Sequence, residues 1–193
     1  MTEPLMGLMQ DDFPLNLHHI RRRMRDVHPD AEVVTLTAPG EVQRATFGEI
    51  SGRVDRLARV LGKLGVQPGD RVGTFAWNNQ RHFELYFAVP CIGAVLHTLN
   101  IRLFEEQITY IVNHAEDRVI FVDESLVPAL AKLAPTFETV TRYVVMGGAE
   151  VQGSYEAAVP LHREEGVQLL APCCHLAQLG SPQAVVDVED HHE

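Results

Sequence analysis

The residue types best suited to metal chemistry gather near the end of the chain, where Cys173, Cys174 and His175 are followed by His191 and His192. Thiolates and imidazoles are the usual ligands of zinc, so a metal site is the first chemistry to consider. Paired zinc ligands are usually spaced about two to four residues apart, and adjacent cysteines do not fit that spacing. The last two histidines stand alone. We therefore expect no metal site in this chain.

The motifs of self-contained catalysis are incomplete in the sequence. A phosphate-binding loop of the form Gly-x-x-x-x-Gly-Lys could end at Gly62 and Lys63, but Leu57 occupies the place of its first glycine. The chain also contains no His-Glu-x-x-His metal motif and no Gly-x-Ser-x-Gly nucleophile elbow. We therefore assign no catalytic, cofactor-binding or metal-binding residue.

Three histidines within the body of the chain could still act as acids or bases, because histidine titrates near neutral pH. His97 lies in an apolar run typical of a strand, so we expect a hydrogen-bonded structural role for it. His82 and His114 fall in helical runs, and we expect both of their side chains to be exposed. None of the three is given a catalytic role.

Composition places the chain among globular proteins. Its 193 residues suit one domain, or one domain with an extension, and 46% of them are hydrophobic, which is enough to bury a core. The net charge of -10 disfavours nonspecific binding to nucleic acid or to anionic membranes. The one basic cluster, formed by Arg21, Arg22, Arg23 and Arg25, is expected to be a solvated helix face.

The sequence shows no targeting or membrane-spanning segment. No window approaches the roughly 20 apolar residues that a transmembrane helix needs. The first residues lack the basic-then-apolar layout of a secretory signal. The three cysteines are too few and too unevenly placed for a disulfide framework, which predicts a reducing, cytoplasmic location.

Hydrophobic spacing predicts alternating helices and strands through most of the chain. A helical stripe over residues 13–30 precedes two short β-like runs, and Thr46 with Glu49 forms the capping-box spacing that starts the next helix. Asn78 is expected to cap a further helix through Cys91. Strands are expected over residues 70–77, 94–99, 118–122 and 143–146.

These strands are almost continuously apolar and are separated by helix-length segments, which indicates an α/β fold with a mostly parallel sheet and helices on both faces. We expect a doubly wound core over roughly residues 30–150, with residues 119–122 as an interior strand. The domain is expected to cover residues 13–159. Residues 160–193 hold one arginine against six acidic residues and three prolines, so we expect an irregular, disordered tail there.

An ordered set of turns and apolar runs makes the chain similar to a known family. A Pro-Gly-Asp turn at residues 68–70 leads into a strand, and Asn100 and Arg102 lie in an Asn-x-Arg-Leu turn after the next strand. Together with the run FAVPCIGAVLHTLNIRL, these features resemble the N-terminal subdomain of the adenylate-forming (AMP-binding) superfamily, and within it the medium- and long-chain fatty acyl-CoA synthetases. The resemblance covers roughly residues 16–158 and is strongest over residues 65–123.

The resemblance implies the N-terminal portion of a fatty-acid–CoA ligase, which forms an acyl-adenylate from a fatty acid and ATP and then transfers the acyl group to coenzyme A. ATP, Mg²⁺ and coenzyme A are implied for the intact enzyme and none for this chain. The family's Ser/Thr/Gly-rich phosphate loop and C-terminal lysine do not occur in the 193 residues, so we expect the chain alone to be inactive. For Asn100 and Arg102 the resemblance implies a role in setting the turn.

Two other functions remain open. The chain could be a noncatalytic interaction module that pairs with itself as a homodimer, or with an intact synthetase, and it could be one half of a split enzyme. A fatty acid is expected as substrate only for the intact enzyme. If a shift of reading frame causes the change of composition at residue 160, another frame of the gene should encode a phosphate loop ending in Pro-Lys-Gly.

Overall fold

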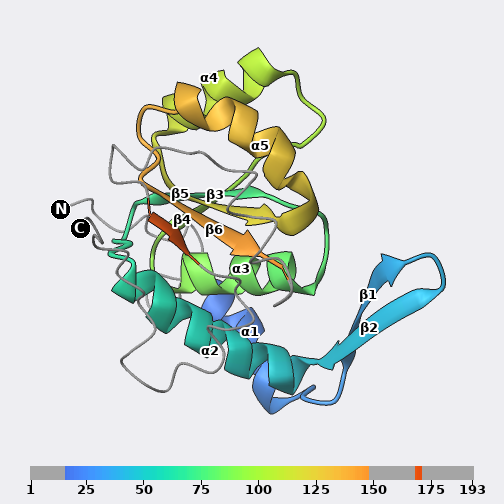
Figure 1. Cartoon of the computed structure of the whole chain (residues 1–193). Helices are drawn as coiled ribbons and strands as arrows, with labels where there is room; N and C mark the ends of the chain where they lie inside the picture. The colour runs from blue at the N-terminus through green and yellow to red at the C-terminus, as the bar shows by residue number, and fades with distance from the viewer. Residues whose placement is uncertain (1–15, 148–167, 171–193) are drawn as a thin grey trace, which may run out of the picture.

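The computed structural model describes residues 16–147 and 168–170 and shows an α/β fold built on one parallel sheet (Figure 1). The five strands of the sheet lie in the order β4-β3-β5-β6-β7, and all neighbouring pairs are parallel. A separate antiparallel hairpin, β1-β2, precedes the sheet in the chain. The described elements are α1 (Leu17–Asp26), β1 (Glu32–Ala38), β2 (Glu41–Thr46), α2 (Phe47–Lys63), β3 (Arg71–Phe75), α3 (Gln80–Cys91), β4 (Val95–Thr98), α4 (Glu105–Ala115), β5 (Asp117–Asp123), η1 (Glu124–Leu126), α5 (Val127–Leu133), η2 (Ala134–Thr136), β6 (Arg142–Met146) and β7 (Gln168–Leu170).

The strand order explains why helices cover both faces of the sheet. The chain steps from β3 to β4 through α3, and then crosses back past β3 to reach β5 through α4. Because parallel crossovers are right-handed, this reversal of direction places the later helices on the opposite face. Figure 1 shows α1, α2 and α3 below the sheet and α4 and α5 above it. The predicted fold class, a parallel sheet with helices on both faces, is confirmed.

Strand β5 lies inside the sheet and contributes to two hydrophobic cores. Val119 and Phe121 pack into the core on the side of α2 and α3, whereas Ile120 and Val122 pack into the core on the side of α4 and α5. All four side chains are buried, as expected for a strand that helices cover on each side. The prediction that residues 119–122 form an interior strand is confirmed by the pairing of β5 with β3 and β6.

The hairpin β1-β2 extends away from the sheet and leaves one of its faces open (Figure 1). The cross-strand partners Leu36 and Val42 are 70% and 52% exposed, and Val34 on the same face is 50% exposed. Where the hairpin joins α2, the Thr46 hydroxyl accepts from the Glu49 backbone N–H, and the Glu49 carboxylate accepts from the Thr46 backbone N–H. The predicted capping box therefore starts α2.

Two local predictions on the first helices are wrong. Asn79, and not Asn78, caps α3, because the side-chain oxygen of Asn79 accepts from the backbone N–H of His82 at 3.0 Å. Arg21 does not lie on a fully solvated helix face, because α1 packs against α2. The Arg21 guanidinium is mostly buried there and pairs with Asp55 of α2.

The sheet continues into the range that we expected to be an irregular tail. The backbone of β7 pairs in parallel with β6, so these three residues form a short strand. Pairing with β6 covers what would otherwise be an open edge of the sheet. The remaining part of the predicted tail, residues 160–167 and 171–193, lies outside the described residues. Across the part of the chain that the structure describes, no helix is both long and apolar enough to cross a membrane.

Candidate functional site

The loops that follow β3, β4 and β5 meet at one edge of the sheet, here called the carboxyl edge, because the three strands are parallel. In open parallel sheets, ligands usually bind at this edge, at the point where neighbouring strands send their helices to opposite faces. That point lies between β3, which leads to α3, and β5, which leads to α5. The polar and aromatic residues there, Trp77, Asn79 and Asp123, form the candidate site.

Asp123 is the centre of the candidate site and holds the loop between β3 and α3 against β5. Its carboxylate accepts hydrogen bonds from the backbone N–H of Trp77 at 2.7 Å and from the side-chain amide of Asn79 at 3.0 and 3.2 Å. Burial raises the pKa of the Asp123 carboxyl, while these donors act in the opposite direction. Because both oxygens bind donors of the same loop, Asp123 positions that loop.

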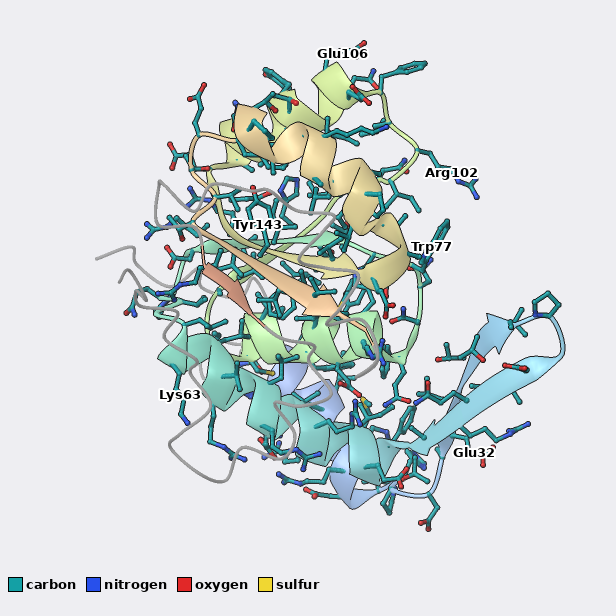
Figure 2. All side chains as sticks on the ribbon, in the orientation of Figure 1. Glu32, Lys63, Trp77, Arg102, Glu106 and Tyr143 are labelled. Carbon is teal, nitrogen blue, oxygen red and sulfur yellow. The ribbon has the colours of Figure 1, made fainter. Side chains whose placement is uncertain are left out.

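Trp77 presents an aromatic surface at the carboxyl edge. Its indole N–H donates to the Ser125 hydroxyl at 3.0 Å, and about half of its side chain is exposed. Phe104, which precedes α4 at the same edge, is also exposed. Figure 2 shows Trp77 and Arg102 on the same side of the molecule, both pointing away from the sheet. The edge therefore combines a fixed loop with exposed aromatic side chains.

The turn after β4 lies at the same edge and has the structural role that the resemblance implied. The Asn100 side-chain oxygen accepts from the backbone N–H of Arg102 at 3.0 Å, and the Asn100 backbone carbonyl accepts from the N–H of Leu103 at 3.1 Å. These two bonds close the turn.

His82 lies beneath the Trp77 loop, and the prediction that it is exposed is wrong, since its side chain is only 4% exposed. Its Nε2 lies 2.9 Å from the Thr74 hydroxyl, and its Nδ1 lies 3.2 Å from the Trp77 carbonyl oxygen. A carbonyl only accepts, so we assign the proton to Nδ1, and Nε2 then accepts from the Thr74 hydroxyl. Burial lowers the pKa of His82, which favours this neutral ring. Both ring nitrogens are thus used inside the protein.

The buried carboxylate of Glu84, together with Gln80, holds the first turns of α3 against α2 and the hairpin. One Glu84 oxygen accepts from the Gln80 amide at 2.8 Å and from the Arg53 guanidinium at 2.6 Å. The Gln80 backbone N–H donates to the Thr35 hydroxyl at 3.0 Å. Burial raises the pKa of Glu84, and the bonds from Gln80 and Arg53 oppose that rise. These contacts tie α3, which follows the loop of the candidate site, to α2 and to the hairpin.

His97 pairs with a buried carboxylate away from the candidate site. Its Nδ1 lies 2.9 Å from both oxygens of Asp117, which is completely buried at the start of β5. The pair joins β4 to β5 across β3, and this is possible because Gly73 of β3 has no side chain. His97 therefore has the hydrogen-bonded structural role that we predicted. His114 is exposed, as predicted.

The described residues contain no cluster of side chains suited to binding a metal ion. Within residues 16–147 and 168–170, no group of three His, Cys, Asp or Glu residues could hold a metal ion. The cysteines and histidines of residues 173–175 and 191–192 lie outside that part of the chain. The carboxyl edge can position a loop and offer an aromatic surface for packing.

Comparison with known proteins gives one consistent family. A profile described as AMP-binding enzyme matches residues 21–187. A 3-methylmercaptopropionyl-CoA ligase of Ruegeria lacuscaerulensis is 46% identical over 143 residues, which are 74% of this chain and 26% of that protein. A medium-chain-fatty-acid–CoA ligase of Ectopseudomonas oleovorans is 46% identical over 119 residues, which are 62% of this chain and 22% of that protein.

Solved structures give the same result. A crystal structure described as a long-chain-fatty-acid CoA ligase from Rhodopseudomonas palustris superposes with a TM-score of 0.60 and 28% sequence identity, over 69% of this chain and 33% of that one. The chain thus spans 22 to 33% of the length of these three proteins.

Proposed function

The chain belongs to the AMP-binding enzyme family, and we propose that it forms the N-terminal subdomain of a fatty-acid–CoA ligase. The intact ligase activates a medium- or long-chain fatty acid with ATP to form acyl-AMP, and then transfers the acyl group to coenzyme A. In this function the described residues supply a scaffold. The groups that carry out the chemistry belong to the rest of the ligase.

The observation that carries the proposal is the 46% identity to two CoA ligases over 143 and 119 residues of alignment. The geometry of the carboxyl edge agrees with a scaffold role. Asp123 and Asn79 hold a loop in place, and Trp77 is exposed beside them. An exposed aromatic side chain next to a fixed loop is suited to packing against a further domain.

The described residues do not fit a site for Mg²⁺ and ATP by themselves. The buried carboxylate at the carboxyl edge, Asp123, is engaged by Trp77 and Asn79, and His82 is engaged by Thr74. Family membership implies ATP, Mg²⁺ and coenzyme A for intact enzymes. We therefore assign no step of acyl-adenylate or thioester formation to a residue of this chain.

A noncatalytic interaction module is the second candidate function, and the hairpin is the observation that favours it. Val34, Leu36 and Val42 form an apolar face with no partner among the described residues. A two-stranded hairpin is marginally stable on its own, so a face of this kind gains from being covered. The apolar face of the hairpin would pack against a second copy of the chain in a homodimer, or against an intact synthetase.

An activity assay on the purified chain tests the first proposal. ATP, Mg²⁺, octanoate and coenzyme A are mixed with the chain, and pyrophosphate release is measured, with the Ectopseudomonas oleovorans ligase as positive control. We expect no release above the rate without protein. Release that depends on the chain would contradict the scaffold role. Sedimentation of the same sample tests the second candidate, since a monomer at all concentrations would exclude self-pairing.

A further inference from the structure

The basic residues of α1 surround a hollow in the protein surface that the proposed ligase function does not use. The hollow is lined by His18, His19, Arg21, Arg22 and Arg25. All five lining residues are basic or can become so, although the chain as a whole carries a net charge of -10. Charges farther away than about 8 Å are largely screened at physiological salt, so the local charge decides what the hollow attracts.

Two arginines of the hollow form ion pairs with carboxylates. The Arg21 guanidinium pairs with Asp55 and also donates to the backbone carbonyl of Ser51. The Nε of Arg21 is buried and has no hydrogen-bond partner among the described residues. Arg25 pairs with its neighbour Asp26 at 2.7 Å. Asp55 balances the charge of Arg21 and holds its mostly buried side chain in place. Asp26 balances the charge of Arg25, but both of these side chains are about half exposed.

Arg22 supplies the surplus charge of the hollow. Its side chain is exposed and lies 3.1 Å from Nδ1 of His19. The hydrogen bond from Arg25 lowers the pKa of the Asp26 carboxyl and the charge of Arg22 helps to lower it, but Asp26 makes its close ion pair with Arg25. His18, also exposed, lies one helical turn before Arg22 and on the same side of α1. Both histidines lie in the first turn of the helix, where the helix dipole favours an anion.

We propose that this hollow binds a phosphate group. A guanidinium presents a planar fork of N–H donors that matches the oxygens of a phosphate, and Arg22 offers such a fork at the protein surface. The backbone N–H groups of His18 and His19 are bonded to the N-cap residue Asn16, so the first turn of the helix contributes its dipole and the two imidazoles to the hollow. The phosphate could belong to the headgroup of an anionic phospholipid or to a soluble phosphate compound, because both present the same oxyanion. The proposal is independent of whether the intact protein is a ligase.

The test measures binding of two probes by the full chain. The first probe is vesicles that contain phosphatidylglycerol and phosphatidylcholine, with vesicles of phosphatidylcholine alone as the control. The second probe is inorganic pyrophosphate, and its binding is measured by calorimetry. The double variant R22Q/R25Q removes two charges from the hollow, and R102Q removes one exposed arginine at the carboxyl edge (Figure 2). We expect R22Q/R25Q to weaken binding by at least about tenfold, on the basis of roughly fivefold for each arginine, and R102Q to bind like the wild type.

The two probes separate the sources of the phosphate. Binding of the phosphatidylglycerol vesicles alone identifies a lipid headgroup, and binding of pyrophosphate identifies a soluble phosphate; either result supports the proposal if R22Q/R25Q loses it. No binding of either probe at low salt, or equal weakening by R102Q, overturns the proposal. The exposed Arg22 side chain makes one hydrogen bond among the described residues, to His19, so the single variant R22Q should fold and repeats the test if the double variant does not.

Discussion

Replacing Asp123 by alanine should destabilise the chain strongly, because it leaves two donors at the carboxyl edge without an acceptor. The backbone N–H of Trp77 and the side-chain amide of Asn79 bind the Asp123 carboxylate at 2.7 and 3.0 Å. A hydrogen bond to a charged group contributes about 1.5–3 kcal/mol. Burial of the carboxylate, which raises its pKa, offsets part of that gain. We therefore expect D123A to lower the free energy of unfolding by about 2–4 kcal/mol.

The assay is urea denaturation followed by tryptophan fluorescence. The chain has a single tryptophan, so its emission reports directly on the loop that Asp123 holds. In native D123A the Trp77 emission should shift to longer wavelength, and acrylamide should quench it more strongly, because the loop is released. D123N keeps one oxygen that can accept from the Trp77 N–H and should lose about half as much stability. The control E106A removes an exposed carboxylate on α4 (Figure 2) and should change stability by about 0.5 kcal/mol or less.

Two results would refute this reasoning. One is a loss in D123A no larger than that in E106A, which would mean that the loop does not depend on the carboxylate. The other is a large loss of stability with unchanged Trp77 emission and quenching in the native state. That outcome would place the effect of Asp123 somewhere other than the loop.

Three further predictions concern the interior of the fold and the gene. Burial lowers the pKa of His82 below its ordinary value of 6.5, so the unfolded state binds more protons than the folded state as the pH falls through that value. The free energy of unfolding should therefore fall as the pH drops from 7 to 5, by at most about 1.4 kcal/mol per pH unit from this residue. Urea denaturation of H82Q over the same range should show a weaker dependence on pH, and an equal dependence would contradict this. A Cβ at Gly73 would lie 3.0 Å from Asp117 Oδ2 and from Ile120 Cγ1, so G73A should cost about 1–3 kcal/mol. The control is G62A in α2, where an added Cβ would have no atom within 4 Å, so this variant should be neutral or stabilised by up to about 1 kcal/mol. Equal melting temperatures of G73A and G62A would show that the sheet is not packed as described. If a shift of reading frame causes the change of composition at residue 160, the gene beyond that codon should encode a Ser/Thr/Gly-rich loop ending in Pro-Lys-Gly when it is translated in another frame. Absence of such a loop from all three frames would contradict the frame shift and favour the interaction module.

The parallel sheet was predictable because its signals are local. The run of apolar residues at 119–122 indicates a strand buried on both faces, and the spacing of Thr46 and Glu49 marks the start of α2. Each of these signals lies within a few residues, and the chain supplies them in an order that few layer arrangements satisfy.

The candidate site was not predictable because its contacts join distant residues. Asn79 and Asp123 are 44 residues apart, and they meet only because β3 lies next to β5. The burial of His82 was not predictable for the same reason, because its hydrogen-bond partner Thr74 lies on another element, β3. Helix α3 has apolar residues on most of its sides, so the sequence does not show which side of the helix faces the core. His97 reaches Asp117 only across Gly73, and sequence alone does not place that glycine between them.

The scaffold role is tested most directly by a chimera with a known ligase. The 119 residues of the Ectopseudomonas oleovorans medium-chain-fatty-acid–CoA ligase that match this chain are replaced by the corresponding residues of this chain, and octanoyl-CoA formation is measured. We predict that the chimera forms octanoyl-CoA, while the 193-residue chain alone forms none. A folded chimera without activity, or activity of the chain by itself, would contradict the conclusion that this chain is the supporting subdomain of a CoA ligase.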